Sequence, residues 1–281
     1  MDSYVWRGQR CPPMCRGGEG MGEMMKENDA RFGRKLLIIG FWLLVWQLGA
    51  FAVDNPIILV GPWETVLALG RLIPDRDFWR SIAYSFGRIA VGFGAAFGAG
   101  IILGSCGYAL AFVRDLLEPV MTLLKSIPVA SFVILALIWA GSGNLSVLIA
   151  FIVVLPMIYV NTLAGLGSTD RKLLEMAEVF RMPMGRKIRY IYVPALLPYL
   201  KSGCRIALGM CWKSGVAAEV IGVPDHSIGE KLYMAKIYLD TGDVLAWTLV
   251  IILVSIGFER AVLGLLGRLA PGGGRHESDG A

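Results

Sequence analysis

Long stretches without charged residues alternate with short polar segments along this chain. Three of them contain no Asp, Glu, Lys or Arg: residues 36–53, 89–113 and 126–169. A membrane-spanning helix needs about 20 mainly apolar residues, so the first two stretches each predict one such helix. The third is long enough for two, and it is interrupted by Gly141-Ser142-Gly143-Asn144, a composition typical of turns. The pattern therefore predicts four membrane-spanning helices.

Two more apolar stretches, 194–221 and 244–266, complete the pattern, although both contain a few charges. Lys201 and Arg205 lie near one end of the first of them, where long side chains can extend their charges to the membrane surface. The sequence therefore predicts an all-α, polytopic membrane protein with six transmembrane helices.

Basic residues predict which ends of these helices face the cytoplasm. Three of them precede the first helix within residues 31–35, and six more lie within 170–189. Because Lys and Arg close to a span favour the cytoplasmic side, both segments are expected inside. Residues 54–80 and 222–243 are then outside, and both termini are cytoplasmic.

Shorter patterns add local detail. Residues 63–73 are amphipathic and follow Pro62, which predicts a short helix at the membrane interface. Arg114 and Asp115 predict a short inside loop before Pro119. The second span contains glycines whose small-xxx-small spacing predicts close packing against another helix: Gly92, Gly94, Gly98, Gly100, Gly104 and Gly107.

These features divide the chain into three parts. Residues 1–35 are rich in Gly, Met and charge without periodicity, which predicts a disordered cytoplasmic tail or translated sequence upstream of a later start. Such a start would lie at Met21, Met24 or Met25. Residues 36–268 form the transmembrane domain, with a cytoplasmic loop at 170–194, and residues 269–281 form a polar tail.

Composition favours a membrane protein over a large soluble core. Hydrophobic residues make up 56% of the chain, 17% are charged, and the mean hydropathy is +0.61. The net charge of +5 does not indicate nucleic-acid binding, because the basic residues form no continuous face. Cys11 and Cys15 have no further Cys or His nearby to complete a metal site, and the other three cysteines are expected to be buried as small hydrophobes.

The inside loop contains a helical pattern of its own. Residues 172–180 have helical propensity, with an apolar stripe formed by Leu173, Leu174, Ala177 and Phe180. Such a helix can dock into a groove on a partner, where the small Ala177 permits close approach and Glu175 can pair with basic groups. The alternative is a helix that lies on the lipid headgroups, held by its positive charges.

This loop resembles the cytoplasmic motif of binding-protein-dependent ABC transporter permeases, written E-A-A, three residues, G, nine residues, I-x-L-P. Glu175, Ala177, Ile191 and Pro194 are in register with it, and Val193 takes the place of Leu. Further segments are similar to the nitrate, sulfonate and taurine branch, and the resemblance covers roughly residues 36–268. These segments are 61–66, 85–93, 126–128 and 159–165.

Two positions depart from the motif. Met176 replaces the first Ala, and Arg181 replaces the Gly, which would supply a left-handed turn between two short helices. Pro183 and Gly185 are expected to move this turn downstream, to residues 182–185.

The resemblance implies a subunit of a type I importer in the inner cell membrane. It would work with a second permease copy, a dimer of cytoplasmic ATPases and an external substrate-binding protein, and would carry a small anionic solute; a neutral or heteroaromatic solute is the alternative. The motif implies coupling to the ATPase through Leu173, Glu175, Ala177, Phe180, Arg181, Gly185, Ile191 and Pro194. The chain contains no G-x-x-x-x-G-K-[ST] phosphate-binding loop, so ATP is bound by the partner and this chain is expected to be neither an enzyme nor the holder of a cofactor.

Polar residues within the spans are candidates for the solute path, because an ionisable group at membrane depth usually faces a cavity. Lys213 and Glu219 lie in the fifth span, and their separation of about 240° around a helix places them on different faces. Lys213 is expected to add positive charge to an anion path. The alternative is a structural role, in which it pairs with a backbone carbonyl or with the opposite subunit. Asn161, near the inner end of the fourth span, is expected to hydrogen-bond between helices or to act in gating.

Two other classes of membrane protein fit the residues less well. A secondary transporter or small channel would carry acidic or His residues in its spans for ion coupling, and the uncharged stretch 126–169 argues against this. A membrane scaffold that moves no solute would need no organised amphipathic loop.

Overall fold

The computed structural model describes residues 19–53, 55 and 57–268, and this part of the chain is helical without any strand. Its elements are α1 (Glu19–Val53), α2 (Pro62–Leu72), α3 (Arg76–Ala109), α4 (Ala111–Ser126), α5 (Val129–Gly167), α6 (Arg171–Val179), α7 (Met184–Lys187), a π-helical turn (Ile188–Tyr192), α8 (Val193–Gly222), α9 (Ile228–Ile237) and α10 (Thr241–Arg268). The prediction of an all-α protein is confirmed.

Three helices of the described residues, α3, α5 and α10, are long and apolar enough to cross a membrane by length and composition. The apolar part of α1, Leu37–Val53, is shorter. The predicted number of six spans and the orientation of the termini stay predictions. Helix α1 begins within the region 1–35 that was expected to be a tail, whereas residues 1–18 and 269–281 lie outside the described residues.

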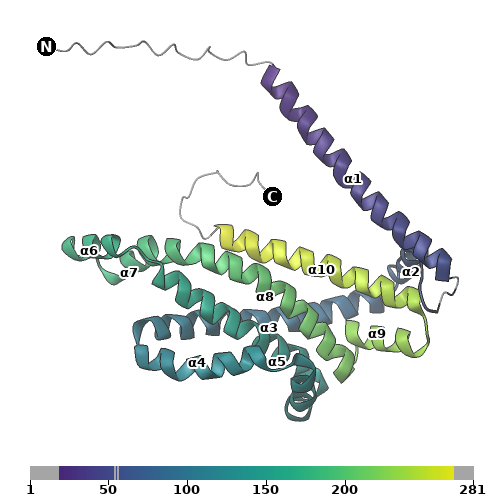
Figure 1. Cartoon of the computed structure of the whole chain (residues 1–281). Helices are drawn as coiled ribbons and strands as arrows, with labels where there is room; N and C mark the ends of the chain where they lie inside the picture. The colour runs from purple at the N-terminus through teal and green to yellow at the C-terminus, as the bar shows by residue number, and fades with distance from the viewer. Residues whose placement is uncertain (1–18, 54, 56, 269–281) are drawn as a thin grey trace.

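Helix α5 lies between α3 and α8 and packs extensively against both, and these three helices form the centre of the molecule (Figure 1). The main core cluster contains fully buried side chains from each of them, among them Ile89, Ile158 and Leu208. Helix α10 covers α8 and α9, and α1 projects away from the other helices (Figure 1). Most of the apolar side chains of Leu37–Val53 in α1 are therefore exposed, as expected for a helix surrounded by lipid.

Glycines on α3 set how closely it approaches α5. A Cβ atom on Gly92 would lie 2.5 Å from the backbone oxygen of Val147. Gly100 and Gly104 similarly face Ile158 and Thr162, at 2.8 Å and 2.7 Å. The predicted close packing is confirmed at these positions. It is wrong for Gly94 and Gly98, which face open space because they lie on the other side of the helix.

The chain reverses between α3 and α4 at a single extended residue, Leu110, with φ −128° and ψ 109°. Arg114 and Asp115 lie inside α4, where their exposed side chains form an ion pair with a separation of 3.5 Å. The expected loop before Pro119 is therefore wrong, because these charges mark the exposed face of a helix. Pro119 is also within α4.

The uncharged stretch 126–169 is broken at two places. Gly141 has φ 67° and ψ 169°, a conformation for which glycine is suited, and it divides α5 into a short first part and a long second part. This confirms the predicted turn. The first part, 129–140, is about 18 Å long, which is too short to cross a hydrocarbon core of about 30 Å by itself. Extended backbone at Ile127 and Pro128 separates it from α4.

The predicted helix at residues 63–73 is confirmed as α2, which has Pro62 in its first turn, and its place at the membrane interface stays a prediction. Helices α8 and α10 contain the predicted fifth and sixth apolar stretches. One of the three cysteines expected to be buried is exposed, namely Cys106, whereas Cys204 and Cys211 are buried in the core.

We expect Gly92→Ala to destabilise the protein by about 1–3 kcal/mol, because the new methyl group collides with the backbone of α5, which cannot move aside. Gly94→Ala on the same helix should be neutral or slightly stabilising, since no atom lies within 4 Å of its Cβ position. Thermal unfolding of both variants in detergent measures the difference. Equal melting temperatures would show that the packing of α3 on α5 does not depend on this contact.

Candidate functional site

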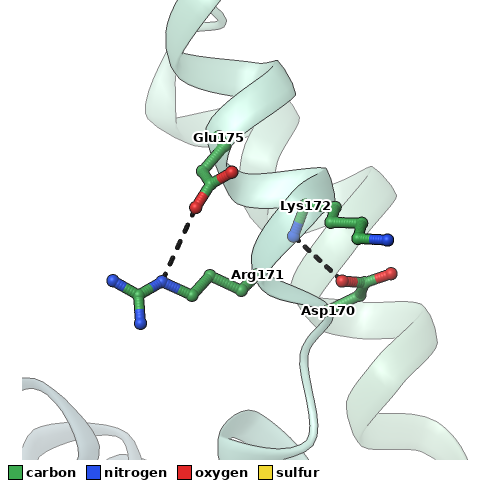
Figure 2. Close-up of polar contacts among 4 residues, drawn as sticks. All are labelled: Asp170, Arg171, Lys172 and Glu175. Carbon is green, nitrogen blue, oxygen red and sulfur yellow. Dashed lines mark hydrogen bonds and ion pairs between the residues drawn. The ribbon is translucent and has the colours of Figure 1, made fainter.

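The loop between α5 and α8 folds into two short helices, α6 and α7. Asp170 caps α6, because its Oδ1 atom accepts a hydrogen bond from the backbone N–H of Lys172 at 2.9 Å (Figure 2). One turn further, Arg171 Nε lies 3.6 Å from Glu175 Oε1 in an ion pair that is exposed to solvent. Exposed pairs of this kind contribute little to stability, so Glu175 can exchange Arg171 for another basic group at little cost.

Arg181 ends α6 in a left-handed conformation, with φ 48°. The backbone N–H of Met182 donates to the oxygen of Ala177 at 2.8 Å, and that of Arg181 donates to Glu178 at 2.9 Å. These two bonds form a Schellman motif, in which the left-handed position is usually glycine. Arg181 therefore adopts the conformation that the Gly of the motif would adopt.

The expectation that the turn moves downstream to residues 182–185 is wrong. The chain turns between Phe180 and Pro183, and Gly185 is part of the helix α7. The physical reason is that the two Schellman bonds fix the end of α6 at Arg181, and a non-glycine residue tolerates this conformation at a cost of about 1–2 kcal/mol.

The two sides of α6 differ in what they contact. Ala177 is fully buried and Leu174 is half-buried, so this side packs against the chain itself. The expected approach of a partner at Ala177 is therefore wrong, because this side chain is covered by the chain itself. The side that faces outward carries exposed apolar residues: Leu173, Met176, Val179 and Phe180, with Phe180 exposed to 75%. An apolar surface of this kind next to basic residues is typical of a protein contact.

The loop connects to α8 without a break. Between α7 and α8 the backbone forms a π-helical turn, in which the N–H of Val193 donates to the oxygen of Ile188. Pro194 follows and has no N–H to donate, which fits its place in the first turn of α8. Ile191 is buried and fastens the turn to the helices, whereas Pro194 is exposed.

The three polar residues expected in the solute path lie in different surroundings. Lys213 is exposed on α8, and the exposed apolar residues around it on the same face are Ile206, Met210, Ala217 and Ile221. Glu219 is fully buried, so Lys213 and Glu219 lie on different faces of α8, as predicted. Asn161 donates from Nδ2 to the oxygen of Met157 in its own helix at 2.8 Å, so the expected bond between helices is wrong. Its side chain instead packs against Gly203 of α8.

Glu219 belongs to a polar cluster that the sequence did not reveal. Ser85 of α3 donates from Oγ to Glu219 Oε2 at 2.6 Å, and the N–H of Gly229 of α9 lies 3.4 Å from the same oxygen. Ser85 was part of a segment similar to the permeases, but nothing in its spacing indicated a partner 134 residues away. Among the described residues, no group of three or more His, Cys, Asp or Glu side chains could hold a metal ion.

Residues 62–271 match the family described as "Binding-protein-dependent transport system inner membrane component". The chain belongs to this family. The match includes the α6–α7 loop, α8 and the cluster around Glu219, so these features are parts of an inner-membrane transport component and not of an enzyme.

Several relatives of this permease have been assigned to transport systems. It is 28% identical to a putative aliphatic sulfonates transport permease protein of Bacillus subtilis, across 82% of this chain and 84% of the relative. It is 26% identical to the taurine transport system permease protein of Escherichia coli, across 88% and 91%. It is 30% identical to a bicarbonate transport system permease protein of Synechococcus elongatus, across 66% and 69%. The resemblance to ABC transporter permeases of the nitrate, sulfonate and taurine branch is confirmed.

The family gives the permease its place in a larger assembly. A binding-protein-dependent system of this type requires a substrate-binding protein and an ATPase, and this chain supplies the membrane component. The predicted location in the inner membrane is confirmed.

We expect Arg181→Gly to stabilise the end of α6 by about 1 kcal/mol, because glycine adopts φ 48° without the clash that a Cβ introduces. Hydrogen exchange at the amide of Met182 should slow about fivefold, the factor that corresponds to this energy. The matched control Arg186→Gly places glycine in the helical α7 and should speed exchange in that helix. Equal exchange at Met182 in Arg181→Gly and the unaltered protein would contradict the assignment of strain to Arg181.

Proposed function

We propose that this permease forms, together with a second copy, a path for a small anion, and that it spans the membrane six times with both termini in the cytoplasm. The transmembrane domain is residues 36–268, with the cytoplasmic loop at 170–194, and the basic residues of this loop support its inside location. The observation that carries the proposal is the position of Lys213 on α8.

Lys213 is exposed on α8 between two exposed apolar residues, Met210 and Ala217. A lysine at membrane depth is costly unless it faces water, a counter-charge or a cavity. The face is free in the single chain, which supports its pairing with a second copy around a shared path. A positive charge at that place attracts anions and repels cations.

The solutes named for the relatives agree with this charge. Aliphatic sulfonates, taurine and bicarbonate all carry an anionic group, and each is named for a relative that aligns with most of this chain. We therefore infer an anionic solute, and a neutral or heteroaromatic solute is the less favoured alternative.

The outward face of α6 is the proposed contact with the ATPase. Leu173, Met176 and Phe180 expose an apolar surface that suits a groove on a partner, and Glu175 is held only by an exposed ion pair. Because the loop continues through the π-helical turn into α8, a displacement of α6 acts directly on the helix that carries Lys213. This connection links ATP hydrolysis in the partner to the solute path.

We expect Lys213→Met to reduce uptake of an anionic solute about tenfold or more, which corresponds to about 1.4 kcal/mol of lost attraction. The measurement is uptake of labelled taurine, ethanesulfonate and bicarbonate into proteoliposomes that contain the permease and its ATPase, with the substrate-binding protein of the system added outside. Lys201→Met on the same helix is the matched control, because Lys201 lies near the cytoplasmic end expected for α8. If all three solutes accumulate in the Lys213→Met variant as well as they do in the control, Lys213 does not line the path.

We expect Phe180→Ser to reduce co-purification of the ATPase, because it removes the most exposed aromatic side chain of the contact surface. The control is Arg171→Ser. Because Arg171 lies on the opposite side of α6, this substitution should leave the complex intact. Affinity purification through the permease and measurement of bound ATPase compares the two variants. If the Phe180→Ser complex forms in normal yield and shows normal ATP-driven uptake, this surface is not the contact with the ATPase.

A further inference from the structure

Helix α4 turns back beside α3 and has three different faces (Figure 1). One face packs against the main core cluster through Leu117, Met121 and Leu124. A second face is exposed and apolar, and it consists of Phe112, Leu116, Val120 and Leu123. The third face is exposed and polar, and it consists of Arg114, Asp115, Glu118, Thr122, Lys125 and Ser126. Packing within the chain therefore accounts for only one face of α4.

The two exposed faces of α4 point in opposite directions. Lys125 and Leu116 differ by a rotation of about 180° around the helix axis. A helix that is surrounded by lipid would be apolar on all of its exposed sides. The apolar face of α4 suits lipid, whereas the polar face needs water or a polar partner.

Element lengths place much of this polar face inside the membrane. In the six-span arrangement, α3 and the second part of α5 both run toward the cytoplasm, so the chain between them has to cross back. The first part of α5 supplies about 18 Å of this crossing, and residues 119–126 of α4 supply about 12 Å. Together they match a hydrocarbon core of about 30 Å. Thr122 and Lys125 then lie at membrane depth, and Arg114 and Asp115 lie at the cytoplasmic surface.

The junction between α4 and α5 contains unpaired backbone groups. Within the described part of the chain, no hydrogen bond is formed by the amides of Val129 and Ala130 or by the carbonyls of residues 124–127. Ile127 and Pro128 are exposed, and Pro128 has no N–H group. Non-helical backbone at membrane depth is tolerated only where it is buried in protein or lines a water-filled cavity. The junction therefore needs the same surroundings as the polar face.

Lys125 is the donor on this face that is left for a solute. The hydroxyl groups of Thr122 and Ser126 both donate to backbone oxygens of the preceding turn of α4, at 2.9 Å. Lys125 takes part in none of the ion pairs among the described residues. An uncompensated ammonium group at membrane depth usually faces a cavity or a solute path.

We propose that the polar face of α4 and the junction 126–130 line the cytoplasmic half of the solute path, and that Lys125 selects for anions there. The path supplies water to the unpaired backbone groups and to the ammonium group. Lys213 lies about 30 Å along α8 from its cytoplasmic end, so the two lysines mark the path at different depths. This inference rests on the six-span arrangement and the anion path proposed above.

Thiol labelling of the permease and ATPase complex in nanodiscs tests this assignment. Thr122→Cys places a thiol on the polar face, and Leu123→Cys places one at the same depth on the apolar face. The anionic, water-soluble reagent MTSES should modify Thr122→Cys about tenfold faster or more, because a thiol in hydrocarbon does not ionise. Peptide mass spectrometry reads the modification at each new cysteine. After denaturation, both cysteines should react equally.

The charge of Lys125 is tested with MTSET, a cationic reagent of similar size. At Thr122→Cys, the ratio of the MTSES rate to the MTSET rate should exceed the ratio measured for free cysteine. Lys125→Met should lower this ratio about tenfold, because Lys125 lies one turn from the thiol. Lys125→Arg keeps the charge and should keep the ratio. Uptake of ethanesulfonate should fall in Lys125→Met and persist in Lys125→Arg.

The outcomes separate this inference from its alternatives. Equally slow labelling of Thr122→Cys and Leu123→Cys would show that lipid or the second copy covers the polar face, and it overturns the inference. Equally rapid labelling places α4 outside the membrane and refutes the six-span arrangement as well. A ratio that is the same in Lys125→Met and Lys125→Arg overturns the role of Lys125. Uptake by Lys213→Met tests the anion path on another helix, so its failure can be distinguished from a failure here.

Discussion

The close approach of α3 to α5 is the contact on which the other features depend. Three glycines of α3 let its backbone lie against α5, and α5 in turn supports α8 along its length. Between apolar helices in lipid, the driving force for association comes from such packing and not from the exclusion of water. Because α5 is held from both sides, α8 has a fixed support against which it can move. The loop at one end of α8 and the polar cluster at the other are positioned by this arrangement.

Regular patterns predicted much of this structure. The uncharged stretches predicted the apolar helices. The break at Gly141 inside the longest of them was also predictable, because glycine among other turn-forming residues is a signal that can be recognised locally in the sequence. The chain reversal at Leu110 had no such local signal, because one leucine among apolar residues cannot be distinguished in the sequence from the residues of the helices on both sides. The charges at Arg114 and Asp115 were misleading for a related reason. A charge shows where solvent or headgroups are, and not whether the backbone is helical.

The α6–α7 loop was predictable in its residues but not in its backbone. Helical spacing correctly placed Leu173 and Phe180 on its apolar outward side, but Ala177 of the same predicted stripe is buried. The turn at Arg181 depends on hydrogen bonds that outweigh the preference of the side chain. The cluster at Glu219 was hidden for a different reason. Its members come from three helices, and contacts between residues more than one hundred positions apart leave no periodic trace. A lone carboxyl in an apolar helix was the one indication available.

The π-helical turn before α8 has a consequence for the evolution of the loop. A π turn contains one residue more than an α turn needs, and deletion of that residue restores a regular helix without disturbing its neighbours. Each residue of a helix corresponds to about 100° of rotation, so the same extra residue in a regular α-helix would turn α6 by that angle around the axis of α8. The wide turn takes up the extra residue instead, so the loop and its exposed face keep their direction whether or not the residue is present.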